Sequence, residues 1–196
     1  MKIKFKDILI PTVTLFVICI VVSALLAGTN ALTKDAIAEN SVKKSQEAMK
    51  SVCPFAVSFE ETKGIEGSTN TVYKALDEKG ELKGFAVSVT SKGYGGDVAV
   101  MVGYSMDSKI TGVEILSHSE TPGLGANAAN ESFRKQFEQD APSDGFSVVK
   151  DGTGGSDGKI DAITGATITS NAVTDATNQA LAEVMAAYEN IKGGEQ

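Results

Sequence analysis

The sequence has few of the side chains on which many small functional domains depend. It holds one histidine and two cysteines in 196 residues. That supply excludes zinc fingers, cysteine-ligated iron–sulfur clusters and disulfide-rich scaffolds, which all need more of these ligands. Basic residues are also in deficit, with 18 against 25 acidic residues and a formal net charge of −7. We expect no nucleic-acid partner, because no basic face remains to meet phosphates.

The remaining composition is that of a globular protein. Hydrophobic residues make up 42% and charged residues 22%, a balance that predicts a packed core and excludes wholesale disorder. The 20 glycines lack the triplet period of collagen. A chain of 196 residues has room for one compact domain together with a tail or an anchor.

A long apolar run near the start predicts a membrane anchor. Residues 8–28 contain no charged side chain, and as a helix they would extend about 30 Å, the thickness of a bilayer's hydrocarbon core. The alternative is a signal peptide cleaved after residues 22–24, but the run exceeds the usual h-region of about 7–15 residues. Lys2, Lys4 and Lys6 place the N-terminus in the cytoplasm. We therefore expect a single-pass protein of the inner or plasma membrane, with the lipid bilayer as a partner and an extracytoplasmic C-terminal domain.

Three parts follow from this arrangement. Residues 1–30 form the cytoplasmic tip and the transmembrane helix. Residues 31–54 have apolar side chains at helical spacing and predict a helical stalk that Pro54 ends. Residues 55–196 form the extracytoplasmic domain.

Two pairs of apolar segments with short connections predict β-hairpins. Residues 72–76 and 82–90 flank one turn, and residues 98–104 and 110–116 flank the next. Both connections are too short for a parallel crossover. The sheet is therefore expected to be largely antiparallel.

The second half of the domain predicts flanking helices and two late strands. A short helix is expected at residues 131–139, and strands at residues 146–150 and 159–163. A long final helix keeps apolar residues at helical spacing after an N-cap at Thr169 or Ser170. The fold class is α+β, preceded by one transmembrane helix.

Two glycine-rich segments imitate nucleotide-binding motifs incompletely. Residues 123–128 match G-x-G-x-x-A, but a dinucleotide site also needs a parallel strand directly before the motif. Residues 152–159 resemble a phosphate loop with the wrong glycine spacing, and Ile160 stands where a magnesium-binding hydroxyl is required. An exposed turn is the better interpretation of residues 152–159.

Residues 161–170 carry the strongest local signal. A strand ends there and a helix begins within a few residues, so hydroxyl side chains and free N–H groups gather at a helix N-terminus, where phosphates bind. Gly165 and Ala166 leave room for a bulky group, and Thr167 offers an unhindered hydroxyl. The alternative is that these side chains only cap the helix.

The motifs as an ordered set resemble a known family. Residues 161–167 are Asp-x-x-Thr-Gly-Ala-Thr, which resembles the signature of FMN-binding domains whose last threonine is esterified to the FMN phosphate by a flavin transferase. Gly-Tyr-Gly-Gly at residues 93–96 and Glu-Thr-Pro-Gly-Leu-Gly at residues 120–125 occur upstream, as in that family. With its N-terminal helix, the chain resembles RnfG, a component of the Rnf electron-transport complex. The related NqrC component of the sodium-translocating NADH:quinone reductase shares these motifs.

The resemblance implies a site but no catalytic residue and no metal. It implies FMN attached through its phosphate to Thr167, with Asp161 recognised by the transferase. It further implies a set of cofactor-binding residues in the three motifs: Tyr94, Glu120, Thr121, Gly123, Leu124, Gly125, Thr164, Gly165 and Ala166.

The function implied is that of an electron carrier rather than an independent catalyst. The chain would pass electrons between redox subunits of an ion-translocating ferredoxin:NAD oxidoreductase. Its partners would be the other membrane subunits of the Rnf complex and, during maturation, the flavin transferase. Two alternatives remain open: an NqrC-like component of the sodium-translocating NADH:quinone reductase, and a tethered flavin- or ligand-binding sensor or scaffold without electron transfer.

Overall fold

A computed structural model describes residues 5–193, and the chain divides between Lys43 and Lys44 into two compact units. Helix α1 (Phe5–Val52) supplies the described part of the first unit. Its most apolar window has a mean hydropathy of 2.7 and is not buried at all, unlike the core helix of a soluble protein. The helix is thus long and apolar enough to cross a membrane. The second unit begins before the boundary expected at residue 54, because the last turns of α1 pack within it.

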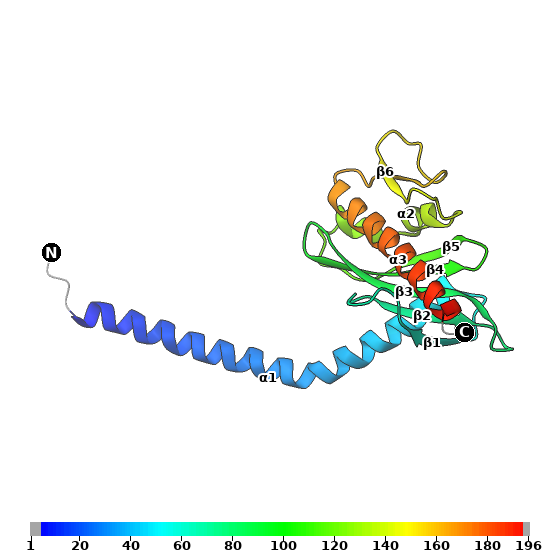
Figure 1. Ribbon diagram of the computed structural model, residues 1–196. Coiled ribbons are helices and arrows are strands. Elements are labelled where there is room, and N and C mark those ends of the chain that lie inside the picture. Colours follow the sequence, from blue (N-terminus) through cyan, green and yellow to red (C-terminus); the bar gives the residue numbers. More distant parts are fainter. Residues whose placement is uncertain (1–4, 194–196) are drawn as a thin grey trace. The chain divides into compact units, whose positions relative to one another are not determined.

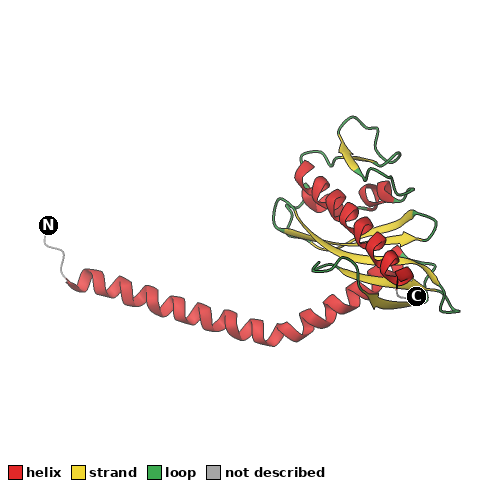
Figure 2. Cartoon of the chain, viewed as in Figure 1, coloured by secondary structure: helices red, strands yellow, loops and turns green. Residues whose placement is uncertain are grey.

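The second unit is built on a five-stranded antiparallel sheet (Figures 1 and 2). Its strands follow one another in chain order: β1 (Ser58–Thr62), β2 (Thr71–Leu76), β3 (Leu82–Lys92), β4 (Asp97–Ser105) and β5 (Lys109–Ser117). The pairing of β2 with β3 and of β4 with β5 confirms both predicted hairpins. Strand β1 was not predicted.

The two faces of the sheet carry separate cores. On β3, the alternate residues Phe85, Val87 and Val89 belong to the larger core, which includes the apolar side chains of the C-terminal helix. Ala86 points to the opposite face and packs in a smaller core with Met49 from the end of α1. The sheet is therefore covered on both faces, and its strands are mostly apolar rather than strictly alternating.

Helix α3 (Thr167–Gly193) lies across the larger core (Figure 1). Its predicted apolar face is confirmed, but the predicted N-cap at Thr169 or Ser170 is wrong. The Ser170 N–H already donates to the Ala166 carbonyl at 3.0 Å, so the helix begins at Thr167. The Ser170 hydroxyl is buried in this first turn, where it donates to the same carbonyl and accepts the Ile163 N–H.

Short elements fill the space between β5 and α3. They are the 3-10 helix η1 (Gly125–Ala129), α2 (Glu131–Arg134), the 3-10 helix η2 (Lys135–Phe137), β6 (Ser147–Val149) and β7 (Lys159–Asp161). The helix expected at residues 131–139 is thus two short helices. Both late strands exist, but they pair in parallel as a separate two-stranded sheet.

Two facing glycines allow α1 to end against the sheet. Gly103 and Gly112 are cross-strand partners on β4 and β5. A β-carbon at Gly103 would stand 2.2 Å from the Val52 carbonyl oxygen, and one at Gly112 would stand 3.1 Å from the Val52 Cα. The Thr111 hydroxyl donates to the same carbonyl, which ties the end of α1 to β5.

A buried carboxylate holds the long β1–β2 connection against α3. Glu183 is only 2% exposed and accepts hydrogen bonds from the Ile65 N–H at 2.7 Å, from the Asn70 side chain at 2.9 Å and from the Ser68 hydroxyl. Burial alone would raise the pKa of Glu183, but these hydrogen bonds outweigh it and hold the pKa below its ordinary value.

We predict that this carboxylate makes the stability of the domain depend on pH. Because the pKa of Glu183 is lower in the folded than in the unfolded chain, its contribution is complete above about pH 4.5 and is lost as the pH falls through the folded-state value. Glu183→Gln places an amide N–H opposite three donors and should cost about 1–3 kcal/mol of unfolding free energy at pH 7. It should also flatten the acid limb of a stability profile measured by urea unfolding. The exposed Glu189→Gln on the same helix is the control, and equal effects of the two variants would contradict the prediction.

Candidate functional site

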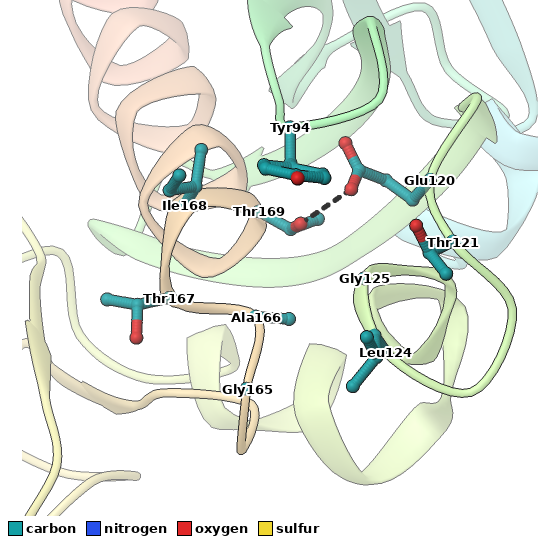
Figure 3. Close-up of a pocket in the computed structure, with 10 residues that line it drawn as sticks. All are labelled: Tyr94, Glu120, Thr121, Leu124, Gly125, Gly165, Ala166, Thr167, Ile168 and Thr169. Carbon is teal, nitrogen blue, oxygen red and sulfur yellow. Dashed lines mark hydrogen bonds between the residues drawn. The ribbon is translucent and has the colours of Figure 1, made fainter.

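A cleft of about 450 Å³ lies at the N-terminal end of α3, within the size range of small-molecule sites. Three segments far apart in the sequence form its walls: the β3–β4 turn, the loop after β5 and the start of α3 (Figure 3). The described residues that line it are Tyr94, Glu120, Thr121, Leu124, Gly125, Gly165, Ala166, Thr167, Ile168 and Thr169.

The β3–β4 turn presents an aromatic side chain to the cleft. The Gly93 N–H donates to the Gly96 carbonyl at 2.8 Å and closes the turn. Tyr94 lies at its tip and is 73% exposed, with its ring above the start of α3 in Figure 3. An exposed tyrosine in this position offers a flat surface and a hydroxyl to a bound group.

A buried carboxylate joins the three walls. Glu120 is 6% exposed, and its Oε1 accepts the Gly95 N–H at 3.1 Å while its Oε2 accepts the Thr169 hydroxyl at 2.8 Å. Its backbone N–H donates to His118 Nδ1 at 3.2 Å, so His118 stabilises the loop from behind.

An apolar contact closes one end of the cleft. A β-carbon at Gly165 would lie 3.2 Å from the Leu124 Cδ2, so the loop after β5 and the start of α3 touch there. Gly165 also has a φ of +75°, which favours glycine. Leu124 and Ile168 remain half exposed beside the cleft and provide an apolar surface for a flat ring.

The start of α3 provides the features of an anion site. Thr167 is its first residue, and the first N–H groups of an α-helix have no carbonyl partner within the helix. The dipole of this 27-residue helix also favours negative charge at that end. Within residues 5–193 the Thr167 hydroxyl makes no hydrogen bond, and Figure 3 shows it pointing away from Glu120.

The structure brings most of the predicted cofactor-binding residues together, but Gly123 and Thr164 do not line the cleft. Thr164 is exposed. Gly123 adopts a φ of +77°, has open space around its Cα and accepts the Asn127 side-chain N–H at 3.0 Å. It is therefore a turn residue. No dinucleotide-binding turn forms at residues 123–128, because β5 is antiparallel and the motif opens only the short helix η1.

Asp161 lies outside the cleft, at the end of β7. Its N–H donates to Gln136 Oε1 at 2.6 Å, while its own Oδ1 is buried without a hydrogen-bond partner among the described residues. Gly154 covers it closely, since a β-carbon there would stand 2.7 Å from the Asp161 Cγ. A buried unpaired carboxylate oxygen is costly, which marks Asp161 as a residue with a task other than stability.

Two lining residues were not predicted as part of the site. Ile168 and Thr169 belong to the first turn of α3, and the late N-cap expected from the sequence hid their position. The alternation of hydroxyl and apolar side chains from Thr167 to Thr169 was the available signal.

We predict that the Leu124–Gly165 contact makes Gly165 unusually sensitive to substitution. Gly165→Ala adds a left-handed backbone penalty of about 1–2 kcal/mol and overpacking against Leu124 of about 1–3 kcal/mol. Gly152 has the same φ of +75° but open space around it, so Gly152→Ala should show the backbone penalty alone. Chemical denaturation of both variants measures the difference, which Leu124→Ala should reduce in the Gly165→Ala background. Equal losses in the two glycine variants would show that the contact carries no cost.

Comparison with known proteins agrees with this geometry. Residues 93–182 match the FMN-binding domain family, and residues 1–52 match the RnfG N-terminal region. The subunit designated G of an ion-translocating oxidoreductase complex from Methanosarcina acetivorans is 38% identical over 187 residues, covering 92% of this chain and 96% of that protein. Its counterpart in the Na⁺-translocating ferredoxin:NAD⁺ oxidoreductase complex of Acetobacterium woodii is 36% identical, covering 97% of this chain and 94% of its own.

The fold is also found in a solved structure. The subunit designated C of the Na⁺-translocating NADH-quinone reductase from Parabacteroides distasonis superposes with a TM-score of 0.57 at 22% identity, covering 75% of this chain and 91% of that one. At this identity the likeness concerns the fold alone. The identity and coverage of the two relatives above show more: the chain belongs to the RnfG family of ion-translocating oxidoreductase complexes and contains an FMN-binding domain.

Proposed function

We propose that this protein is a membrane-anchored electron relay that carries covalent FMN in a ferredoxin:NAD⁺ oxidoreductase complex. The observation that carries the proposal is the cleft, in which residues of all three motif segments meet at the N-terminus of α3. Relatives named as components of such complexes align over nearly the whole chain. The partners would then be the other membrane subunits of the complex, between which this chain passes electrons without acting as an independent catalyst.

The cleft suits the two halves of FMN. The N-terminus of α3 would hold the phosphate through backbone N–H groups, as helix N-termini do for anions. Leu124, Ile168 and Tyr94 would contact the isoalloxazine ring with apolar or aromatic surface. FMN itself supplies the one- and two-electron chemistry, and the protein supplies position and electrostatics.

Thr167 is the residue we assign to covalent attachment. An ester between its hydroxyl and the FMN phosphate forms with net loss of one water, so the chain gains the mass of FMN less water. The free hydroxyl at the first residue of α3 supports this role, because nothing in the described structure must be broken to use it. We assign Asp161 to recognition by the flavin transferase, supported by its unpaired carboxylate oxygen six residues before Thr167.

We predict that Thr167→Ala abolishes covalent labelling and leaves the fold intact. Denatured wild-type protein, made together with its transferase, should fluoresce as flavin and show the added mass, and Thr167→Ala should show neither. Thr167→Ser keeps a hydroxyl and is the matched control, which should retain labelling. Asp161→Asn should lower the labelled fraction without loss of native circular dichroism.

Electron transfer separates the relay from a purely structural component. The complex assembled with Thr167→Ala should lose electron flow through this chain while the subunits remain associated. Covalent flavin in Thr167→Ala would contradict the attachment site. Normal electron flow in that flavin-free complex would leave this chain a scaffold.

We also propose an orientation in the membrane. The three lysines before the apolar run favour a cytoplasmic N-terminus, and they leave the domain with the cleft outside the cytoplasm. Covalent attachment suits that location, because a lost cofactor would not be replaced from a cytoplasmic pool.

This orientation predicts that protease added to intact spheroplasts digests the chain beyond residue 34, whereas a cytoplasmic marker protein survives. Digestion only after lysis would invert the assignment. N-terminal sequencing of the membrane-bound protein tests retention of the anchor, and a chain beginning at Leu25 would show a cleaved signal peptide instead.

A further inference from the structure

Glu120 is the one charged side chain among the described residues that line the cleft. It is 6% exposed, which is unusual for a glutamate unless its charge is compensated by hydrogen bonds. Both carboxylate oxygens act as acceptors, one for the Gly95 N–H and the other for the Thr169 hydroxyl. Two accepting oxygens and no donated hydrogen bond are the pattern of an ionised carboxylate.

The glycines around this carboxylate are explained by its size. A β-carbon at Gly93 would stand 2.2 Å from Glu120 Oε1, and one at Gly125 would stand 2.3 Å from Oε2. Neither glycine has a positive φ, so conformational freedom does not require them there. They are needed because any larger residue would displace the carboxylate. The glycines of two motifs and Glu120 therefore form one packed unit.

We propose that Glu120 is a positioning residue that holds the Tyr94 turn and the first turn of α3 at fixed places, and whose negative charge opposes reduction of the bound cofactor. The second role rests on the proposed function, since it requires FMN in this cleft. Reduction adds negative charge to a flavin, and a buried anion in the same cleft makes that addition less favourable. No basic side chain lines the described cleft to offset it.

The test separates charge from geometry with three variants. Glu120→Gln removes the charge but keeps one oxygen for the Gly95 N–H and offers an N–H to the Thr169 hydroxyl, which can also accept. Thr169→Val keeps the charge and the shape but removes the hydrogen bond. Glu183→Gln changes the other buried glutamate, which lies on α3 about 21 Å along the helix from Thr169, and serves as the control.

The midpoint potential of the flavin is measured by spectroelectrochemistry in the full-length protein. Glu120→Gln should move it to more positive values, so that the ratio of reduced to oxidised flavin at the wild-type midpoint rises several-fold. Glu183→Gln should leave it unchanged. A Glu120→Gln midpoint equal to that of the wild type would overturn the electrostatic role.

The clamp is measured without flavin, by thermal unfolding in the Thr167→Ala background. Thr169→Val should lower the midpoint temperature more than Glu120→Gln does, because it leaves a buried oxygen of an ionised carboxylate unpaired. An unchanged unfolding temperature in Thr169→Val would overturn the clamp. A wild-type chain that carries no flavin would overturn the proposed function and with it the electrostatic role, whereas the unfolding comparison would still decide the clamp.

Discussion

The hydrogen bond between the Glu120 carboxylate and the Thr169 hydroxyl joins two segments separated by 49 positions in the sequence, at a distance of 2.8 Å. With the bond from Gly95, it brings three loops of low regular structure to one place, where none of them could form a site alone. A hydrogen bond to a charged group contributes about 1.5–3 kcal/mol, enough to hold such loops in one arrangement. The cleft, the exposed Tyr94 and the free Thr167 hydroxyl all depend on that arrangement.

Helix α3 is fixed near both of its ends by buried glutamates of opposite connectivity. At its start a loop carboxylate accepts from a helix hydroxyl, and further along a helix carboxylate, that of Glu183, accepts from a loop. Between them the apolar face packs on the sheet. A helix held in this way has little freedom to slide or rotate, so the anion site at Thr167 keeps a constant position relative to the cleft.

The sequence predicted the parts of the fold whose signals are local. The two hairpins have clear turns between apolar runs, and α3 has a long periodic face, so both were found. Strand β1 carries only one apolar residue, Phe59, and owes its existence to pairing with β2. The parallel pairing of β6 with β7 is a tertiary effect between strands of three residues. The start of α3 was missed because Ala166, which has no capping side chain, stands before the first turn, and the hydroxyl of Ser170 turns back to the Ala166 carbonyl.

The packing of Val52 against Gly103 and Gly112 has a practical consequence for preparing this domain. Residues 48–53 at the end of α1 are part of the smaller core, together with Ala75, Ala86 and Met101 on the sheet. A soluble fragment cut at the start of the globular-looking sequence, after Pro54, would uncover that face and expose apolar surface to aggregation. A fragment beginning at Lys44 keeps the cover and discards the apolar span. The anchor and the redox domain thus share a boundary inside one helix, and the useful cleavage point lies upstream of the break that the sequence shows.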